Sequence, residues 1–234
     1  MKHTLMCLTF ALSLNLNAEE KGFVSIFNGK DLSGWTQKGG KARYAVKDGE
    51  IIGTAVPSTP NSFLCTQKIY GNFILEYEFK AEHPMNSGVQ IRSQAFAEAK
   101  EIDLGNGKTR KVPEGRVHGY QVEIDPNKPE RMWTGGVYDE ARRGWLFPGL
   151  RGGDKEKFTK QGQGLYKEKN WNKIRVEARG SHIRTWLNGE LRADFKDGLT
   201  AKGFIGLQVH GIGNKKELVG ATIRWRNLRI KELN

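Results

Sequence analysis

Apolar and polar residues alternate in several short segments along the chain. In the segment 73–80, aromatic and aliphatic residues hold every odd position, and glutamates hold two of the even ones. The segments 86–92, 120–125 and 206–210 show the same alternation. Successive side chains of a β-strand point to opposite faces, so each segment is predicted to be a strand with one face in the core. No long helical period is present, and the pattern predicts an all-β protein.

Turn signals between these segments predict antiparallel pairing. Asp48-Gly49 and Asn188-Gly189 each separate two apolar runs, and such dipeptides favour tight hairpins because they tolerate positive φ angles. Short strands throughout the chain make one two-sheet antiparallel sandwich the leading architecture, with a closed barrel as the alternative. The long segments 96–116 and 147–170 are predicted to be irregular and to form walls of a site.

The polar faces of the predicted strands carry side chains suited to binding carbohydrate. If all four strands lie in one sheet, the face opposite the core presents amides, carboxylates, an arginine and a histidine. Such groups on a rigid sheet match the planar donors and acceptors that sugar hydroxyls require. The residues expected on this face are Gln90, Arg92, Gln121, Glu123, Asp125, Gln208 and His210.

Glu123 and Asp125 are the centre of this expected surface. Residues i and i+2 of a strand lie roughly 6.6 Å apart, so the two carboxylates could grip one sugar ring, water or metal ion together. A solvated outer face of an antiparallel sheet is the plain alternative. Aromatic residues beside charges follow in a stretch predicted to be irregular, including Tyr138 and Trp145, and they favour a ligand site over that alternative.

Composition narrows the classes of function. Lys and Arg exceed Asp and Glu by 38 − 26 = 12, but the positive charge is dispersed among acids and no nucleic-acid-binding module is recognisable. No Cys or paired His residues stand at metal-ligand spacing, so no metal site is predicted. A divalent cation could still bind oxygen ligands from Glu123, Asp125 or Asp139.

The first 18 residues have the composition of a secretory signal peptide. A basic start precedes an apolar run that is too short to span a membrane and that ends near Ala18. Cleavage after Ala18 would leave one domain, residues 19–234, in the periplasm or outside the cell. Cys65 would then be the single cysteine, expected to be buried and inert, and no internal disulfide could form. The mass of the mature protein from its native host tests this expectation.

Seven short motifs, spread over the chain after residue 18, occur in an order typical of one protein family. They are Phe27–Trp35, Asn86–Arg92, Gly119–Asp125, Gly135–Tyr138, Trp171–Lys173, Gly206–Gly211 and Trp225–Leu228. In this order they resemble the 3-keto-disaccharide hydrolase domain family, whose fold is a concanavalin A-like jelly-roll sandwich. Many members carry the amide and the acid of Gln121 and Glu123 in the opposite order, so the chain resembles a subgroup.

The resemblance implies a secreted enzyme that acts on glycosides oxidised at C3 by a partner sugar 3-oxidoreductase. A C3 ketone acidifies the C2 proton, so a base can abstract it, a donor or cation can hold the enolate, and the C1 substituent can leave before water adds. In this scheme Glu123 is the base, and His210 or Asp125 is its partner or the acid for the leaving group. The substrate-binding side chains would be Arg92 and Gln208 near the oxyanion, Tyr138 and Trp145 beside the sugar, and Gln90 and Gln121.

Two other functions remain open. Glu123 and Asp125 also resemble the Glu-x-Asp core of laminarinase-like glycanases, but the further acid of those enzymes would fall near Asn127 or Lys128, and neither is acidic. A carbohydrate-binding module without turnover would suit the same fold and aromatic residues. For His210, a structural hydrogen bond at a strand end is the alternative to catalysis. Turnover assays on oxidised and unoxidised disaccharides separate the three functions.

Overall fold

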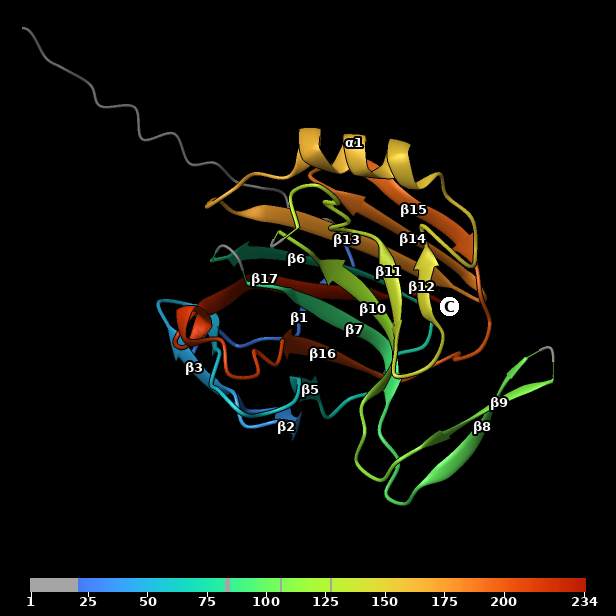
Figure 1. Ribbon diagram of the computed structural model, residues 1–234, viewed down its shortest axis with the longest axis horizontal. Helices are drawn as coiled ribbons and strands as arrows, with labels where there is room; N and C mark the ends of the chain where they lie inside the picture. Colours follow the sequence, from blue (N-terminus) through green and yellow to red (C-terminus); the bar gives the residue numbers. More distant parts are fainter. Residues whose placement is uncertain (1–20, 83–84, 106, 127) are drawn as a thin grey trace, which may run out of the picture.

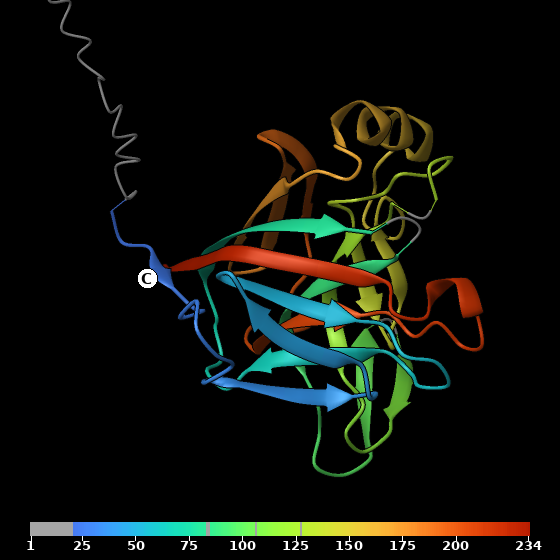
Figure 2. The same ribbon diagram turned by 90° about the vertical axis from the view of Figure 1, so that its left-hand side faces the viewer.

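The computed structural model describes residues 21–82, 85–105, 107–126 and 128–234, and its strands form two large antiparallel sheets (Figure 1). Sheet I has the strand order β12-β11-β10-β7-β16-β5-β2. Sheet II has the order β15-β14-β13-β6-β17-β4-β3, with β1 paired to β17. Two perpendicular views show the sheets packed face to face as a jelly-roll sandwich (Figure 1, Figure 2). The prediction of an all-β, two-sheet sandwich is confirmed.

The elements have the following bounds. Sheet I contains β2 (Trp35–Gly39), β5 (Ser62–Thr66), β7 (Ser87–Gln94), β10 (His118–Ile124), β11 (Val137–Glu140), β12 (Gly144–Phe147) and β16 (Phe204–Val209). Sheet II contains β1 (Val24–Ser25), β3 (Arg43–Lys47), β4 (Glu50–Thr54), β6 (Phe73–Ala81), β13 (Asn172–Arg179), β14 (His182–Leu187), β15 (Glu190–Lys196) and β17 (Thr222–Glu232). Outside the sheets lie β8 (Lys100–Gly105), β9 (Lys108–Val112), α1 (Lys155–Leu165) and the 3-10 turn η1 (Lys216–Leu218).

Both predicted hairpins form at the predicted dipeptides. Asp48 and Gly49 join β3 to β4 with φ angles of 52° and 75°, and Asn188 and Gly189 join β14 to β15 with φ angles of 52° and 96°. Asn, Asp and Gly tolerate this left-handed region better than other residues. The local sequence therefore sets the register next to both turns, and a bulge between Thr185 and Trp186 shifts it further along β14 and β15.

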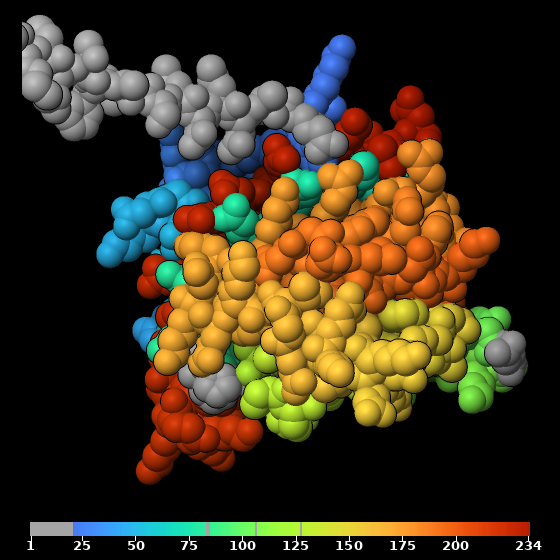
Figure 3. Space-filling model, turned by 90° about the horizontal axis from the view of Figure 1, so that it is seen from above, coloured from blue at the N-terminus to red at the C-terminus, as the bar shows by residue number. Residues whose placement is uncertain are grey.

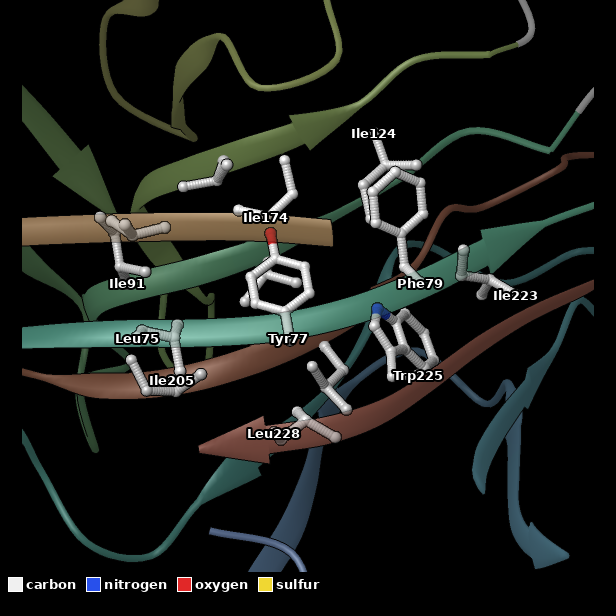
Figure 4. Close-up of a cluster of buried hydrophobic side chains, with 14 of the residues drawn as sticks. Leu75, Tyr77, Phe79, Ile91, Ile124, Ile174, Ile205, Ile223, Trp225 and Leu228 are labelled. Carbon is white, nitrogen blue, oxygen red and sulfur yellow. The ribbon is translucent and has the colours of Figure 1, made fainter. Parts of the chain in front are cut away.

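Apolar side chains from both sheets meet in one core. Figure 4 shows Leu75, Tyr77 and Phe79 of β6 in the same cluster as Ile91 of β7 and Ile124 of β10. All five are almost fully buried, and burial of such side chains is the dominant favourable term in folding. The alternation in the sequence correctly identified the buried face of these three strands.

One predicted strand belongs to the other sheet. β6 pairs with β13 and β17 in sheet II, whereas β7, β10 and β16 are neighbours in sheet I. The expectation of one sheet holding all four segments is wrong in this respect. Alternation reports which side of a strand is buried, but strand order depends on long-range pairing, and both sheets of a sandwich present the same pattern.

Two segments predicted to be irregular contain regular structure. Within 147–170, the Asp154 side chain accepts a hydrogen bond from the Lys157 backbone N–H at 2.8 Å and caps α1. Figure 3 shows the yellow-orange segment with α1 lying against the orange strands of sheet II. Within 96–116, β8 and β9 form a hairpin that extends from the body of the sandwich (Figure 1).

Cys65 lies in a second apolar cluster, on the outer side of sheet I, with Phe63, Val117 and Phe204. It is buried, and desolvation raises the pKa of its thiol to about 12. The thiol is therefore protonated at neutral pH and unreactive, as the sequence predicts.

The expected signal peptide, residues 1–18, lies outside the described residues and stays a prediction. Within the described ranges, no helix has the length and apolar character needed to cross a membrane.

Candidate functional site

The ends of three neighbouring strands meet at one edge of sheet I. β10 and β16 are both antiparallel to the strand between them, β7, so their C-terminal ends lie beside the start of β7 (Figure 1). Asp125 follows β10, His210 follows β16 and Asn86 precedes β7. The topology therefore gathers a carboxylate, an imidazole and an amide from distant parts of the sequence.

A cavity of about 480 Å³ opens on the outer face of sheet I at this edge, a size typical of small-molecule sites. Gly88, which pairs with Glu123 on one side and Gln208 on the other, leaves its floor open. A Cβ at position 88 would lie 2.5 Å from Gln121 Cγ, so glycine is what lets the Gln121 side chain lie across β7. The predicted residues that line the cavity are Gln121, Glu123, Tyr138, Trp145, Gln208 and His210.

A chain of buried amides fixes the orientation of Gln121. Its carbonyl oxygen accepts hydrogen bonds from Gln90 Nε2 at 2.5 Å and from Gln208 Nε2 at 2.9 Å. The Ser93 hydroxyl donates to Gln90 Oε1 at 2.7 Å and orients Gln90 in turn. The Gln121 amide nitrogen is thereby left to donate to Glu123 Oε2 at 2.9 Å. Gln90 thus acts beneath the cavity, by orienting the residue that contacts Glu123.

Glu123 is a buried carboxyl group with an unusual protonation equilibrium. Asn86 Nδ2 donates to its other oxygen, Oε1, at 2.8 Å. Burial first, and the nearby Asp125 carboxylate second, raise the pKa of Glu123 to about 8, while the amide donors and Arg131 act in the opposite direction. A general base is most effective when its pKa lies near the working pH, so this group is suited to proton transfer.

Asp125 holds an arginine in the cavity wall. The Arg131 guanidinium donates to Asp125 Oδ2 at 2.6 Å, and the Asp125 side chain is fully buried. Burial raises the pKa of Asp125, and Arg131 lowers it. Arg131 lines the cavity while Asp125 lies behind it. Asp125 therefore positions Arg131, and its expected role as an acid facing the substrate does not fit this placement.

His210 stands at the cavity with one tautomer favoured. Its Nδ1 lies 2.7 Å from the Gly211 carbonyl oxygen, and a carbonyl can only accept, so Nδ1 carries the hydrogen. The neutral ring therefore keeps the lone pair on Nε2. Partial desolvation lowers the pKa of His210, with the Lys215 ammonium acting in the same direction. The structural hydrogen bond and a proton-transfer role are thus compatible in one side chain.

Tyr138 and Trp145 form an aromatic wall on strands. They are cross-strand neighbours on β11 and β12, with ring centroids 5.4 Å apart in an edge-to-face arrangement. Trp145 also packs edge-to-face on Trp133 at 4.7 Å, and the Arg131 guanidinium lies 5.0 Å from the Trp145 ring. The prediction of an irregular segment here is wrong, because two four-residue strands are too short to show a clear alternation.

Arg92 does not lie in the cavity. A β-bulge interrupts the pairing of β7 with β10, and Arg92 has a positive φ of 48°. Its side chain instead donates to the Gly71 carbonyl at 2.7 Å and to the Gly180 carbonyl at 2.6 Å, next to the ends of β6 and β13 in sheet II. The expected place of Arg92 near an oxyanion is wrong, because the bulge breaks the two-residue period.

Gln208 also differs from its expected role as an oxyanion donor. Its amide nitrogen donates to Gln121, and its buried Oε1 has no partner among the described residues. A buried polar atom without a partner is costly, so this oxygen is suited to accept a hydrogen bond from a ligand hydroxyl.

The sequence pattern did not predict several of the residues that line the cavity. Asn86, Lys128, Arg131, Glu140 and Lys215 all line the cavity. Most of them lie in the loops that follow β10 and β16. Their position directly after two predicted site strands was the sequence signal that could have identified them. Glu140 pairs with Arg116 at 2.5 Å.

Asp139, the third oxygen ligand considered for a divalent cation, lies apart from Glu123 and Asp125. Its carboxylate accepts from Arg142 Nε at 2.8 Å and Arg143 Nε at 2.6 Å. Throughout the part of the chain that the structure describes, no group of three or more His, Cys, Asp or Glu is placed to hold a metal ion.

The sequence matches the model of one protein family over residues 22–231, and that family is described as the 3-keto-alpha-glucoside-1,2-lyase-like domain. No curated protein is significantly similar to the chain.

Two solved bacterial structures have a similar fold. A candidate glycosyl hydrolase from Parabacteroides distasonis has 20% sequence identity and a TM-score of 0.54, over 91% of this chain and 94% of that one. A protein of unknown function with a galectin-like fold from Bacillus subtilis has 11% identity and a TM-score of 0.55, over 85% and 89% of the two chains. At such low identity the similarity shows a shared sandwich fold.

Proposed function

The chain belongs to the family of 3-keto-alpha-glucoside-1,2-lyase-like domains, and from this membership we propose that it is an enzyme that cleaves glycosides with a ketone at C3. The observation that carries the proposal is the buried Glu123 carboxyl group in the cavity, whose pKa is raised to about 8. Ordinary glycan binding does not require a carboxyl group with a shifted pKa, whereas removal of a carbon-bound proton requires a base of this kind.

The first step would be abstraction of the C2 proton by the Glu123 carboxylate. The electron pair of the C–H bond forms a C2–C3 double bond, and negative charge develops on the C3 oxygen. Arg131 is the cation suited to stabilise that oxygen, because it lines the cavity and Asp125 orients its guanidinium. Arg131 thus takes the role that the sequence resemblance gave to Arg92.

The second step would break the bond between C1 and the leaving oxygen. The enolate re-forms the C3 ketone, the electron pair shifts to give a C1–C2 double bond, and the leaving oxygen takes up a proton. His210 lines the same cavity and is suited to deliver that proton when it is in its charged form. Addition of water across the new double bond returns a proton to C2 and a hydroxyl to C1, which completes a net hydrolysis.

The strand register disfavours a mechanism with two carboxylates. Glu140 is the other carboxylate that lines the cavity, and it pairs with Gly119, four residues along β10 from Glu123. Four residues of a strand span about 13 Å between backbone positions, whereas the paired carboxyl groups of glycosidases stand roughly 5 to 9.5 Å apart, so Glu140 is poorly placed to be the second carboxylate. The proposal also needs a partner oxidoreductase that oxidises the C3 hydroxyl before cleavage.

The test compares a 3-keto-disaccharide with its unoxidised parent. We expect the protein to cleave the keto substrate and leave the parent intact. Glu123→Gln should lower kcat by about 10² to 10⁴, because it keeps the size of the side chain and removes the base. His210→Gln should slow the reaction when the leaving group is a poor one, and Asp125→Asn should act through Arg131.

A folded Glu123→Gln variant with the original rate would move the base to another residue. Absence of cleavage of both sugars by the unmodified protein, with measurable binding of either one, would instead favour the carbohydrate-binding module.

A further inference from the structure

Positive charge lines the cavity where the strands of sheet I end. Lys128 and Arg131 come from the loop after β10, and Lys215 comes from the loop after β16. β10 and β16 run in the same direction, so both loops leave the same edge of the sheet. Three cations from two separate segments therefore face one hollow.

Two of these cations, Lys128 and Lys215, form no ion pair among the described residues, and Lys128 acts on the Asp125 carboxylate only at longer range. Arg131 is neutralised by Asp125 at 2.6 Å, and the cavity carboxylate Glu140 is neutralised by Arg116. Among the described residues, neither Lys128 nor Lys215 is within ion-pair distance of an Asp or Glu side chain. With Glu123 ionised as the base, two ammonium groups face one carboxylate, which leaves one positive charge unbalanced.

We propose that the glycoside cleaved in this cavity carries a singly charged anionic group that binds between Lys128 and Lys215. The inference rests on the proposed function, since it names the substrate class of the same site. A carboxylate is such a group, and in a glycoside it stands either at C6 of the oxidised sugar or on the aglycone. Charge-assisted hydrogen bonds from ammonium groups to a carboxylate are stronger than neutral ones.

The rest of the cavity agrees with this placement. The aromatic wall of Tyr138 and Trp145 lies on β11 and β12, to one side of β10, whereas Lys215 follows β16 on the other side of β7. The apolar face of a sugar ring can lie against the aromatic wall while a charged substituent reaches the loops. Glu123, on β10, stands between these two regions.

The experiment uses three 3-keto-glycosides that differ in one group. One is neutral, one has a carboxylate at C6 of the oxidised sugar, and one has a carboxylate on the aglycone. We expect one of the two acidic substrates to have a kcat/KM about tenfold or more above that of the neutral one, with most of the difference in KM. That advantage should shrink as ionic strength rises. The arm that shows it identifies the position of the charge.

Three variants connect the effect to the lysines. Lys128→Gln and Lys215→Gln should each remove most of the preference for the acidic substrate, measured within each variant as the ratio of kcat/KM for the acidic substrate to kcat/KM for the neutral one. Lys216→Gln is the matched control, because Lys216 is the next residue in the chain and is exposed, outside the cavity lining. It should preserve the preference in full.

Calorimetric binding of the unoxidised acidic and neutral glycosides separates this inference from the proposed function. Lysine-dependent preference for the acidic glycoside without turnover of any keto substrate would support the anionic site and contradict the proposed enzyme. Turnover of all three keto substrates with equal kcat/KM, unchanged in both lysine variants, would overturn the anionic site and leave the proposed enzyme intact.

Discussion

Two opposing effects act on the protonation of the Glu123 carboxyl group. Hydrogen bonds from amides favour its charged form, whereas burial and a neighbouring carboxylate favour its neutral form. Asn86 and Gln121 each donate one hydrogen bond to it, while burial and Asp125 raise its pKa to about 8. A base must be deprotonated to act, so kcat/KM for a 3-keto-glycoside whose good leaving group needs no proton from His210 should rise with pH and level off above about pH 8. Rates measured between pH 5 and pH 9 check this. A flat profile across that range would mean that Glu123 does not titrate during the reaction.

The same pKa shift makes a prediction about stability. The folded-state pKa is raised above the unfolded value of about 4.3, so the unfolded chain loses this proton first as pH rises. The stabilisation is complete below pH 4.3 and is lost as pH rises toward 8. Glutamine at position 123 does not titrate, so the variant does not lose this stabilisation as pH rises. The free energy of unfolding of Glu123→Gln minus that of the unmodified protein should therefore increase by more than about 1 kcal/mol from pH 5 to pH 8. Urea unfolding at both pH values measures the gain, and an equal difference at both would contradict the shifted pKa.

Single residues could be predicted from the sequence where strand periodicity was intact. The two-residue period predicts that the side chains of Gln121, Glu123 and Gln208 point away from the core, and all three line the cavity. Arg92 failed because a bulge with a positive φ angle redirects its side chain, and a bulge leaves no clear mark in one sequence. Arg131 was missed because it lies in a loop, where no period applies.

At the scale of elements, the cavity depends on β7 having no side chain at position 88. A methyl group there would lie 2.5 Å from Gln121 Cγ and 2.6 Å from its Cδ. Gly88→Ala should therefore displace the Gln121 amide from Glu123 and lower kcat/KM by about 100-fold, the order expected for a 1 Å misplacement in a catalytic site. Steady-state kinetics on the keto substrate and circular dichroism of the folded variant check this.

The control for that change is Gly164→Ala in α1. No atom lies within 4 Å of a Cβ built at Gly164, and the position is helical and distant in sequence from the cavity. This variant should keep full activity and raise stability by roughly 0.5 to 1 kcal/mol. A Gly88→Ala enzyme as active as the Gly164→Ala enzyme would show that the orientation of Gln121 does not matter.

Other elements were predictable to different degrees for physical reasons. The hairpins at Asp48-Gly49 and Asn188-Gly189 were predicted because their turn chemistry is local. α1 was missed because it is polar, contains Gly162 and Gly164, and buries only Phe158 and Gly162 among its described residues, so it shows little apolar period. The Asp154 cap was the remaining sequence signal for its start.

At the scale of the whole molecule, the sandwich was predictable and the assignment of strands to sheets was not. Strands of both sheets alternate in the same way because both pack on one core. Periodicity therefore shows which face of each strand is buried, but it does not show which strands pair. The seven motifs identified the family, whose model matches residues 22–231, but they did not assign the strands to the two sheets. The site was predictable only in part, because its residues come together through the neighbouring ends of β10, β7 and β16, which pair over long distances in the sequence.

A buried ionic cluster joins the two sheets away from the cavity. Asp197 follows β15 of sheet II, and its carboxylate accepts from Arg143 Nη1 at 3.0 Å, Arg151 Nε at 2.6 Å and the Tyr120 hydroxyl at 2.5 Å. Arg143 precedes β12 of sheet I, and Tyr120 lies on β10. These donors hold the pKa of Asp197 well below its usual range despite burial. One carboxylate thus connects strands of both sheets.

Asp197→Asn should destabilise the protein by about 1.5 to 3 kcal/mol at pH 7, because Arg151 loses its counter-ion, the buried Arg143 keeps only Asp139, and hydrogen bonds to a charged acceptor are lost. A carboxyl group with a lowered folded-state pKa stabilises the protein above its unfolded pKa of about 3.9, and this contribution is lost as pH falls below that value. The difference between variant and unmodified protein should therefore be large at pH 7 and smaller at pH 3. Asp194→Asn is the matched control, because Asp194 is exposed and its ion pair with His182 is worth about 1 kcal/mol or less. Equal unfolding midpoints in urea for the two variants at pH 7 would show that the cluster does not hold the sheets together.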